Sequence, residues 1–398
     1  MSNNSDKGTR NLNVPTLRFP EFEGEWECHI LSELVTVPKE RVSNADITKS
    51  NYISTENMLT NFEGVRSAEK IPSTDSVQSY LPNDILVSNI RPYLKKIWLS
   101  NKEGGCSTDI IIFRTNSNHN SSFLYYLLAS DSFISYVMSS AKGVKMPRGD
   151  RNQMLKYITF TPKHNEQIKI VSFLHLIDSR ISVQIKIIES LESLIKGLEK
   201  TLFEECIKTD KHVALKDIST IITRKNDYVS DYPVMMISAE NGFINQSEKY
   251  SNDNAGSSLA KYTLLKKGEL AYNRGSSKTK KYGSIFTLQL ESALIPYVYH
   301  SFSLNTNICD ADFYGYFLNS KLLDKELRKI VSSSARMDGL LNISKEDFFS
   351  IKVPNPCLKK QQKIAKGLNA LHSKLQIEKS LLEQLNSQKR FLLSQMFI

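Results

Sequence analysis

Two segments of the chain match each other without a gap at an offset of 194 residues. Residues 166–203 read EQIKIVSFLHLIDSRISVQIKIIESLESLIKGLEKTLF, and residues 360–397 read KQQKIAKGLNALHSKLQIEKSLLEQLNSQKRFLLSQMF. This period is much longer than the roughly 20 to 50 residues of a solenoid repeat. The match therefore indicates a duplicated unit, made of one globular domain followed by one helix.

Apolar residues in both segments recur at alternating steps of four and three, the heptad pattern of helices that wind around a partner. Gln184 and Glu378 interrupt the two seams at the same place. A polar side chain there sets the register of pairing, because any other register would bury it without a hydrogen-bond partner. The predicted pairing residues are Ile170, Leu174, Ile177, Ile181, Ile188 and Leu191 in the first helix and Ile364, Leu368, Leu371, Leu375, Leu382 and Leu385 in the second.

The simplest partner of each helix is the other helix. At 1.5 Å per residue, about 40 residues form a rod of about 60 Å, long enough to hold two globular domains apart. An alternative is that the two helices are unrelated and that each packs on its own domain. A helix on a globular domain usually carries a broader apolar stripe than this strict seam, which favours pairing.

The segments that precede the helices match more loosely. Leu31–Leu34 corresponds to Leu215–Ile218 at an offset of 184, whereas 139–141 corresponds to 333–335 at the full 194. The second globular part has therefore gained ten residues, while the helices have kept their length. We expect a disordered tail at 1–13, domains at 14–162 and 209–356, and spacer helices at 163–208 and 357–398.

Length and composition fit two domains. A chain of 398 residues that is 40% hydrophobic can bury a core in each of two or three domains. No apolar stretch is long enough to span a bilayer, and residues 1–13 lack a signal core, so we expect a cytoplasmic protein with no membrane partner. The five cysteines and seven histidines form no CxxC, HxH or HExxH motif, so no metal site is predicted.

The formal net charge of +10 is distributed unevenly. Residues 1–206 contain 24 Lys and Arg against 24 Asp and Glu, whereas residues 207–398 contain 28 against 18. All of the excess positive charge thus lies in the second half. A pI near 9.1 is compatible with an anionic partner such as nucleic acid.

Within each globular part the pattern is short and mixed. Strands are expected at 84–88, 109–114, 232–237 and 297–300, and helices at 121–139 and 313–331. The sequence therefore predicts two mixed α/β domains of some 145 residues each.

Basic and small polar residues gather in loops at two matching positions of each domain, one after a strand and one after the internal helix. Such residues, with exposed backbone amides, hold phosphates and reach base edges. Any one loop could instead be a solvated charged surface, but the matching positions favour contact with DNA. The candidates are Arg91, Tyr93, Lys95, Lys96, Lys142, Lys145, Arg148 and Arg151 in the first domain and Asn273, Arg274, Ser276, Lys278, Lys280, Lys281, Tyr282 and Arg336 in the second.

Several motifs resemble one family, the specificity subunits of type I restriction-modification systems. The opening Pro15-Thr-Leu-Arg-Phe-Pro-Glu-Phe22 with Gly24-Glu-Trp26 is similar to the usual start of these subunits. Further matches are the strand and loop at 268–276, the Pro-x(3)-Glu-Gln helix entry at 162–167, and the duplicated helices. Two departures are that Lys360-Gln361 replaces Glu-Gln, and that Ile90-Arg-Pro92 replaces the Arg-Gly-Ser loop in the first domain.

The resemblance implies two target-recognition domains that each read one half of a bipartite, asymmetric site in double-stranded DNA. It further implies antiparallel spacer helices that fix the gap and dock two methyltransferase subunits, with restriction and translocase subunits in the full complex. A two-fold axis that relates two domains on one duplex must also reverse one helix against the other. Because the two domains differ, we expect unlike half-sites.

Motifs of nucleic-acid enzymes are missing from the sequence. It contains no GxGxxG, no Gly-x4-Gly-Lys, no Asn-Pro-Pro-Tyr or Asp-Pro-Pro-Tyr, and no nuclease signature. We therefore expect a noncatalytic subunit that binds no cofactor, with S-adenosylmethionine, ATP and Mg²⁺ bound by its partners. Two alternatives remain open: a coiled-coil scaffold without base readout, and a self-sufficient DNA-modifying enzyme with unrecognised motifs.

Overall fold

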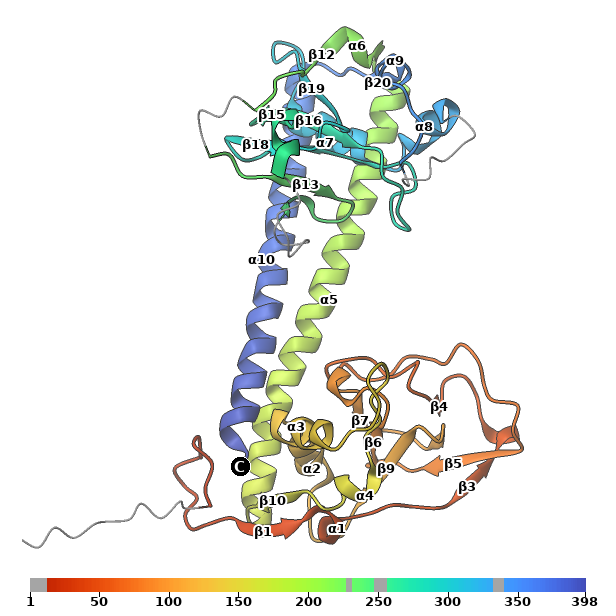
Figure 1. Ribbon diagram of the computed structural model, residues 1–398, viewed down its shortest axis with the longest axis vertical. Coiled ribbons are helices and arrows are strands. Elements are labelled where there is room, and N and C mark those ends of the chain that lie inside the picture. The colour runs from red at the N-terminus through yellow and green to blue at the C-terminus, as the bar shows by residue number, and fades with distance from the viewer. Residues whose placement is uncertain (1–12, 227–230, 247–255, 332–339) are drawn as a thin grey trace, which may run out of the picture. The chain divides into compact units, whose positions relative to one another are not determined.

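The structure, a computed structural model, describes residues 13–226, 231–246, 256–331 and 340–398, with only the backbone of 256–258. The chain divides into two compact units (Figure 1). Unit 1 contains the residues up to Ile185 together with Ser380–Ile398, and unit 2 contains Lys186–Lys379. Each unit therefore combines one globular domain with a stretch of both long helices.

Unit 1 contains two four-stranded sheets and a two-stranded ribbon. One sheet has the order β2-β9-β6-β7 and is antiparallel, and the other has the order β3-β5-β8-β4 with β4 parallel to β8. The ribbon pairs β1 with β10. The strands are β1 (Glu27–Ile30), β2 (Val35–Thr36), β3 (Arg41–Ser43), β4 (Tyr52–Ile53), β5 (Ser76–Tyr80), β6 (Ile85–Ser88), β7 (Ile97–Leu99), β8 (Gly104–Cys106), β9 (Ile110–Thr115) and β10 (Ile158–Thr161), and the short helices are α1 (Leu31–Leu34), α2 (Ser121–Leu128), α3 (Asp131–Ser139) and α4 (Arg151–Met154).

Unit 2 repeats part of this topology. Its four-stranded antiparallel sheet has the order β12-β19-β16-β17, and a ribbon pairs β11 with β20. Two further pairs, β13-β14 and β15-β18, complete the described strands. The elements are β11 (His212–Ala214), α6 (Leu215–Ile218), β12 (Ser219–Ile221), β13 (Met235–Ser238), β14 (Gly242–Asn245), β15 (Thr263–Lys266), β16 (Leu270–Asn273), β17 (Ser284–Thr287), β18 (Ser292–Ile295), β19 (His300–Leu304), α7 (Ala311–Asn319), α8 (Asp324–Ile330), α9 (Lys345–Ser350) and β20 (Lys352–Pro354).

The two units share one scaffold and differ in the rest. The ribbon, the short helix after its first strand and the four-stranded antiparallel sheet occur in the same order in both. The second sheet of unit 1 has no four-stranded counterpart among the described residues of unit 2. The internal repeat and the mixed α/β fold predicted from the sequence are confirmed, and the divergence is confined to elements outside the shared sheet.

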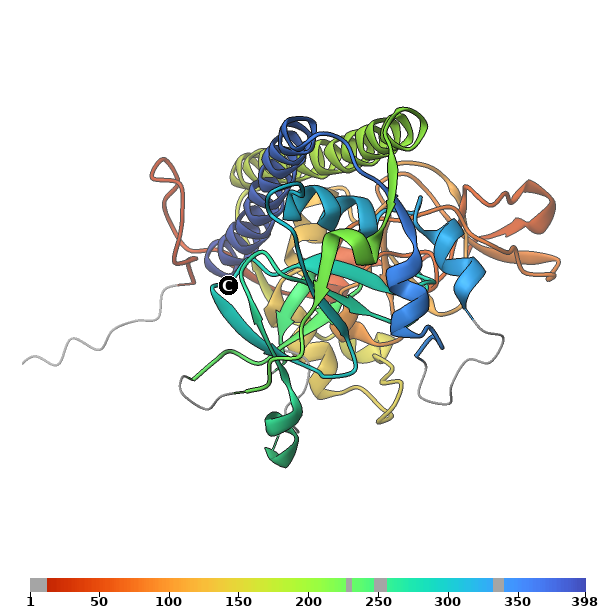
Figure 2. The ribbon, with the colours of Figure 1, turned by 90° about the horizontal axis from the view of Figure 1, so that it is seen from above.

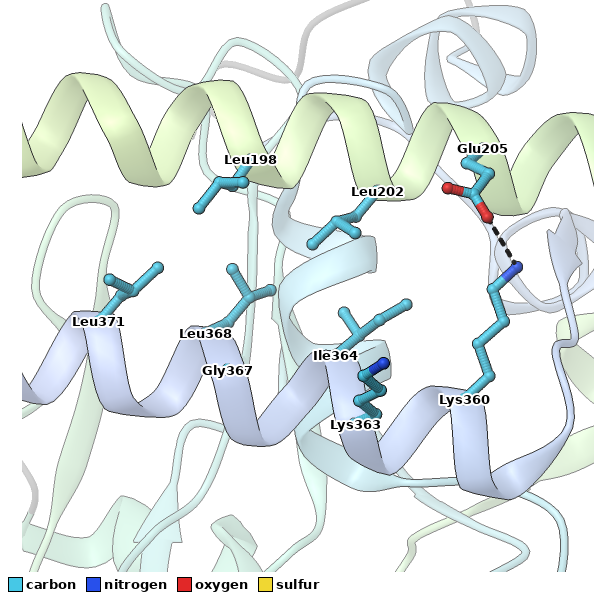
Figure 3. Close-up of a pocket in the computed structure, with 9 residues that line it drawn as sticks. All are labelled: Leu198, Leu202, Glu205, Lys360, Lys363, Ile364, Gly367, Leu368 and Leu371. Carbon is cyan, nitrogen blue, oxygen red and sulfur yellow. Dashed lines mark ion pairs between the residues drawn. The ribbon is translucent and has the colours of Figure 1, made fainter.

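The long helices α5 (His164–Thr209) and α10 (Leu358–Met396) run side by side within each unit (Figure 1). The sequence had placed them at 163–208 and 357–398. Every predicted pairing residue is buried or half-buried. Leu174 and Leu368 are among the most deeply buried, and the half-buried ones are Ile181, Leu191, Leu371, Leu375 and Leu382. In unit 2, Ile364, Leu368 and Leu371 of α10 point toward Leu198 and Leu202 of α5 across a groove of about 360 Å³, beside which Gly367 adds no side chain (Figure 3).

Each domain core includes side chains of both long helices. In unit 1, Ile170 and Leu174 of α5 and Phe397, the residue after α10, pack with the α2 residue Phe123. In unit 2, Phe203 of α5 contacts the rings of Phe313 and Phe317 on α7, and Leu368 of α10 joins the same core. The cyan α7 thus lies between the sheet of unit 2 and its helix pair (Figures 1 and 2).

A buried glutamine near the start of each long helix ties that helix to its domain. Gln167 accepts a hydrogen bond from the backbone N–H of Asn120 at 3.0 Å and donates one to the carbonyl of Pro162. Gln361 accepts from the N–H of Asp310 at 2.8 Å and donates to the carbonyl of Pro356 at 2.7 Å. Asn120 and Asp310 are the N-caps of α2 and α7. The proline-to-glutamine motif is therefore a structural clamp that satisfies buried backbone groups.

Some element boundaries differ from the expectation. The expected helix at 121–139 is two helices, because Ser130 accepts a hydrogen bond from the N–H of Phe133 and caps a new one. The helix expected at 313–331 is likewise split into α7 and α8, since Ser320 is extended. The prediction of a strand at 297–300 is wrong except for His300, because residues 297–299 form a turn. Pro233 lacks a backbone donor, and β13 begins only at Met235.

Three further features concern the described residues only. None of the helices there combines the length and apolarity that a bilayer crossing needs. No three His, Cys, Asp or Glu side chains gather in a way that could hold a metal ion in these parts of the chain. All five cysteines are free thiols, with Cys106, Cys206 and Cys309 buried.

The glutamine clamp makes a testable prediction. Gln361→Leu should lower the free energy of unfolding by about 1–3 kcal/mol, because the buried N–H of Asp310 and the carbonyl of Pro356 would lose their partner. Urea unfolding of the full chain measures the change. The matched control is Gln362→Leu, whose side chain is exposed and whose replacement should change stability by less than about 0.5 kcal/mol. Equal effects of the two variants would show that the clamp contributes nothing.

Candidate nucleic-acid interface

The two predicted loops of unit 1 are hydrogen-bonded to each other. The backbone N–H of Arg91 donates to the carbonyl of Pro147 at 2.8 Å, and that of Gly149 donates to the carbonyl of Asn89 at 2.8 Å. Lys142 and Arg148 exchange backbone hydrogen bonds at 3.1 and 2.9 Å, which closes the second loop on itself. Residues some 50 positions apart in sequence therefore form one surface.

The corresponding loops of unit 2 also meet. The N–H of Leu341 donates to the carbonyl of Arg274 at 3.0 Å, and Gly275 forms a bridge with Leu340. Arg336, which the sequence analysis placed in the second loop, lies outside the described residues. The same strand of the shared sheet, β6 in unit 1 and β16 in unit 2, leads into the first loop of each pair.

Six of the eight candidate side chains in unit 1 are exposed: Arg91, Tyr93, Lys142, Lys145, Arg148 and Arg151. Arg148 lies 3.3 Å from Asp109, but its side chain remains 58% exposed. The neighbouring Val144 and Met146 are also exposed. This surface presents several cations and two apolar side chains to solvent, a combination suited to phosphates and to the methyl groups or stacked faces of bases.

Two lysines of unit 1 are half-buried and bind other groups of the protein. Lys95 forms an ion pair with Asp131, and Lys96 donates to the backbone carbonyl of Thr55 at 2.6 Å. Burial, together with the neighbouring Arg66 and Arg91, lowers the pKa of Lys96. These lysines fix the shape of the loop, and they leave the exposed cations free to reach a ligand.

The backbone at Arg91 is unusual. Arg91 and Lys95 have φ angles of 51° and 52° and flank the 3₁₀ turn Pro92–Leu94. A left-handed conformation is costly for a residue with a β carbon, and such strain gathers at functional sites. The loop is braced by a third segment that the sequence analysis missed: the N–H groups of Asn61 and Phe62 donate to the carbonyls of Leu94 and Lys95. The turn signal Asn61-Phe-Glu-Gly64 could have indicated it.

In unit 2 the exposed candidates are Ser276, Lys278 and Lys281. The half-buried ones hold the loop together. Arg274 donates to the carbonyls of Ile343 at 3.2 Å and Val298 at 3.3 Å, and the amide of Asn273 donates to the carbonyl of Ile237. Lys280 donates to the carbonyl of Asn319, and its burial lowers its pKa. The carbonyl of the half-buried Tyr282 accepts from Tyr272 at 2.7 Å.

A tyrosine attaches each domain to the long helices. In unit 1 the hydroxyl of Tyr126 on α2 donates to Asp178 of α5 at 2.6 Å, and burial beside that carboxylate raises the pKa of Tyr126. In unit 2 the ring of Tyr316 on α7 stacks on His372 of α10, with centroids 4.9 Å apart. Tyr126 and Tyr316 occupy the same position in their helices, since the sequences of α2 and α7 align at an offset of 190.

The opening motif is attached to the first long helix by a buried carboxylate. Arg18 forms a two-bond ion pair with Glu166 of α5, at 2.8 Å for each bond, and the indole N–H of Trp26 donates to the same carboxylate at 3.2 Å. In α10 the corresponding residue is Lys360, which pairs with Asp210 at 2.8 Å. The reversal of charge at this position follows from the different partner, which explains the departure from Glu-Gln.

Comparisons with known proteins agree with this geometry. The type I restriction modification DNA specificity domain matches the chain twice, at residues 23–193 and 210–387. The type I restriction enzyme MjaVIII specificity subunit of Methanocaldococcus jannaschii is 25% identical over 94% of this chain and 92% of its own length. The EcoDI specificity subunit of Escherichia coli is 23% identical over 42% of this chain and 37% of its own.

A solved structure shows the same fold. The type I restriction-modification S subunit from M. genitalium has a TM-score of 0.61 and 18% identity, with 97% of this chain and 99% of that one covered. The resemblance first drawn from the opening motif and the duplicated helices is therefore confirmed. The chain belongs to the type I restriction modification DNA specificity family, and it is a specificity subunit, the noncatalytic DNA-recognition component of such a system.

Proposed function

We propose that each unit reads one half of a bipartite, asymmetric site in double-stranded DNA, that the paired helices set the gap between the halves, and that they dock two methyltransferase subunits. The observation that carries this proposal is the repeated placement of two joined loops after the same strand of a shared sheet. Two copies of one scaffold that present loops of different sequence are suited to two half-sites of different sequence.

The exposed cations support the DNA contact. Unit 1 presents Arg91, Lys142, Lys145, Arg148 and Arg151 on its joined loops, although its half of the chain has no net charge. Such a local concentration is what phosphate binding requires, because counterion release depends on the cations at the interface and not on the net charge of the chain. In unit 2, Lys278 and Lys281 have the same role, whereas Arg274 and Lys280 position the loop.

The helices support docking of protein partners. Leu176, Val183 and Leu194 on α5 and Ile377 on α10 are between 49% and 64% exposed. Side chains of this size in one stripe of a helix are suited to burial against another helix. Methyltransferase subunits on this surface would bring S-adenosylmethionine to the bound site, and restriction and translocase subunits would bring ATP and Mg²⁺. We place the assembled complex in the cytoplasm.

No observation specifically favours either of the two alternative functions. A coiled-coil scaffold needs the seam but gives no role to the joined loops and their exposed cations. A self-sufficient DNA-modifying enzyme needs a site for a cofactor or for activated water, and no feature of the described residues suggests one. The specificity role uses both the helices and the loops.

The first prediction concerns phosphate contacts. The double variant Lys278→Ala with Lys281→Ala should weaken binding to all duplexes and reduce the slope of log affinity against log salt by about two, because about one counterion is released per phosphate contact. The matched control is Lys216→Ala with Lys352→Ala, which removes two exposed lysines from α6 and β20. Fluorescence anisotropy of the reconstituted complex measures both. An equal loss of DNA affinity in the control variant would contradict the assignment of this loop to the DNA interface.

The second prediction concerns base readout. A complex of this chain with its methyltransferase subunits should methylate one asymmetric motif with two specified halves. Arg91→Asn keeps a residue that tolerates the left-handed conformation, but it removes the guanidinium, so it should relax preference in one half-site and leave the other unchanged. Sequencing that detects methylated bases maps the motif. If both halves changed, or neither did, the separate reading of half-sites by the two units would be contradicted.

A further inference from the structure

In the described part of the chain, four ion pairs join α5 to α10. In each pair the acidic residue belongs to α5 and the basic residue belongs to α10. In unit 1, Asp178 lies 2.6 Å from Lys389. In unit 2 the pairs are Glu192–Lys379 at 2.7 Å, Glu199–His372 at 3.2 Å and Glu205–Lys360 at 3.5 Å, the last of which is drawn in Figure 3. The interface therefore joins an acidic helix edge to a basic one.

The charged positions follow the heptads. Asp178, Glu192 and Glu199 are separated by multiples of seven residues on α5, and His372 and Lys379 are seven apart on α10. Each set therefore lies along one edge of the apolar seam. At the repeat offset of 194, Asp178 corresponds to His372. The duplicated helices carry opposite charges at this position, and the other ion-pair residues of each edge align with neutral residues of the other helix, as Glu192 does with Asn386 and Lys379 with Ile185.

This polarity disfavours pairing between two copies of α5. The apolar seams of α5 and α10 correspond at every position except Ile195, where α10 has Lys389, and the shared polar position Gln184/Glu378. A second α5 could therefore occupy the place of α10 with its apolar residues in register. Asp178 of that second copy would then replace His372 and face Glu199. Because such a dimer is symmetric, the contact between carboxylates would occur twice. Lys379 would be replaced by Ile185, which leaves Glu192 without its cation.

Two copies of α10 meet the same difficulty with the opposite sign. In that pairing, His372 of the second copy would replace Asp178 and face Lys389, again at two symmetric positions. Lys379 would face Asn386 in place of Glu192. Each homotypic pairing therefore loses the four attractive contacts. Two α5 helices gain Asp178 against Glu199 and also Glu166, in place of Lys360, against Glu205, each of them twice. Two α10 helices gain His372 against Lys389 twice, which repels when His372 is protonated.

We propose that the charges along the α5–α10 seam form a recognition code, by which the amino-terminal half of this chain accepts only a carboxy-terminal half as its partner, from its own chain or from a second copy. The apolar seam supplies affinity without choosing between the two helices, and the charges supply the choice. If the proposed DNA reading holds, the code also prevents two identical halves from assembling into a reader of a symmetric site.

The test uses the full chain. A protease site inserted between Asp210 and Lys211 allows the protein to fold before it is cut into residues 1–210 and 211–398. Isotope-labelled and unlabelled batches are cut, mixed and allowed to exchange in mild urea, and native mass spectrometry measures the pairs. Heterotypic pairs should exceed either homotypic pair by at least about tenfold. The excess should shrink in about 1 M salt, which screens the charges. A statistical mixture of the three pairs would overturn the code.

A charge reversal tests the assignment to particular residues. Asp178→Lys would place the new lysine against Glu199 in a pair of amino-terminal halves and against Lys389 in the native pair. The fraction of such homotypic pairs should rise at least about tenfold, and adding Lys389→Glu should restore the heterotypic pair. Glu189→Lys makes the same change of charge at an exposed α5 residue with no ion pair among the described residues, and it should alter nothing. An unchanged mixture with Asp178→Lys would contradict the proposal, and this readout involves no DNA, so it stands apart from the test of half-site reading.

Discussion

Both globular domains depend on burial of side chains from the two long helices, which come from different halves of the chain. The core of unit 1 includes Leu392 and Met396 from the end of α10 and Phe397 just after it, and the core of unit 2 includes Phe203 from α5. Removing a buried aromatic side chain of this kind costs about 3–5 kcal/mol, a large fraction of the stability of a domain. The helix pair is therefore part of each domain's core, and the orientation of each domain on the helices is fixed by the same contacts that fold it.

Polar contacts add direction to this burial. Three kinds of contact join a long helix to one particular backbone or side-chain group of its domain. They are the clamps at Gln167 and Gln361, the contacts of Tyr126 and Tyr316, and the ion pair of Glu166 with Arg18. A buried polar group satisfied by one partner disfavours any rotation or sliding that would break the bond. The apolar seam alone would tolerate a shift of one heptad, and these contacts do not.

The features that could be predicted from the sequence are those that produce a regular spacing of residues. The heptads identified α5 and α10, and the offset of 194 identified the duplication, because helices and repeats are local or regular signals. The division of residues 121–139 into α2 and α3 was missed, since a serine cap competes with a continuous helical pattern and the pattern alone does not decide the outcome.

The candidate interface was only partly predictable, for a physical reason. Composition identifies a basic loop, but it does not tell a cation that faces solvent from one that donates to a carbonyl. Arg274 and Lys280 donate to carbonyls of residues 69 and 39 positions away in sequence, at Ile343 and Asn319. Only the fold brings those carbonyls to the loop. By contrast, Lys142 and Lys145 lie in a segment closed on itself, which keeps them exposed.

The central claim is that the paired helices hold two DNA-reading domains at a fixed spacing. The most direct test is to insert seven residues into both helices, after Ile185 and after Lys379, and to map the methylated motif. Seven residues preserve the heptad and add about 10 Å, so the account predicts unchanged half-sites and a gap longer by about three base pairs, at about 3.4 Å each. An unchanged gap, or an altered half-site, would contradict it.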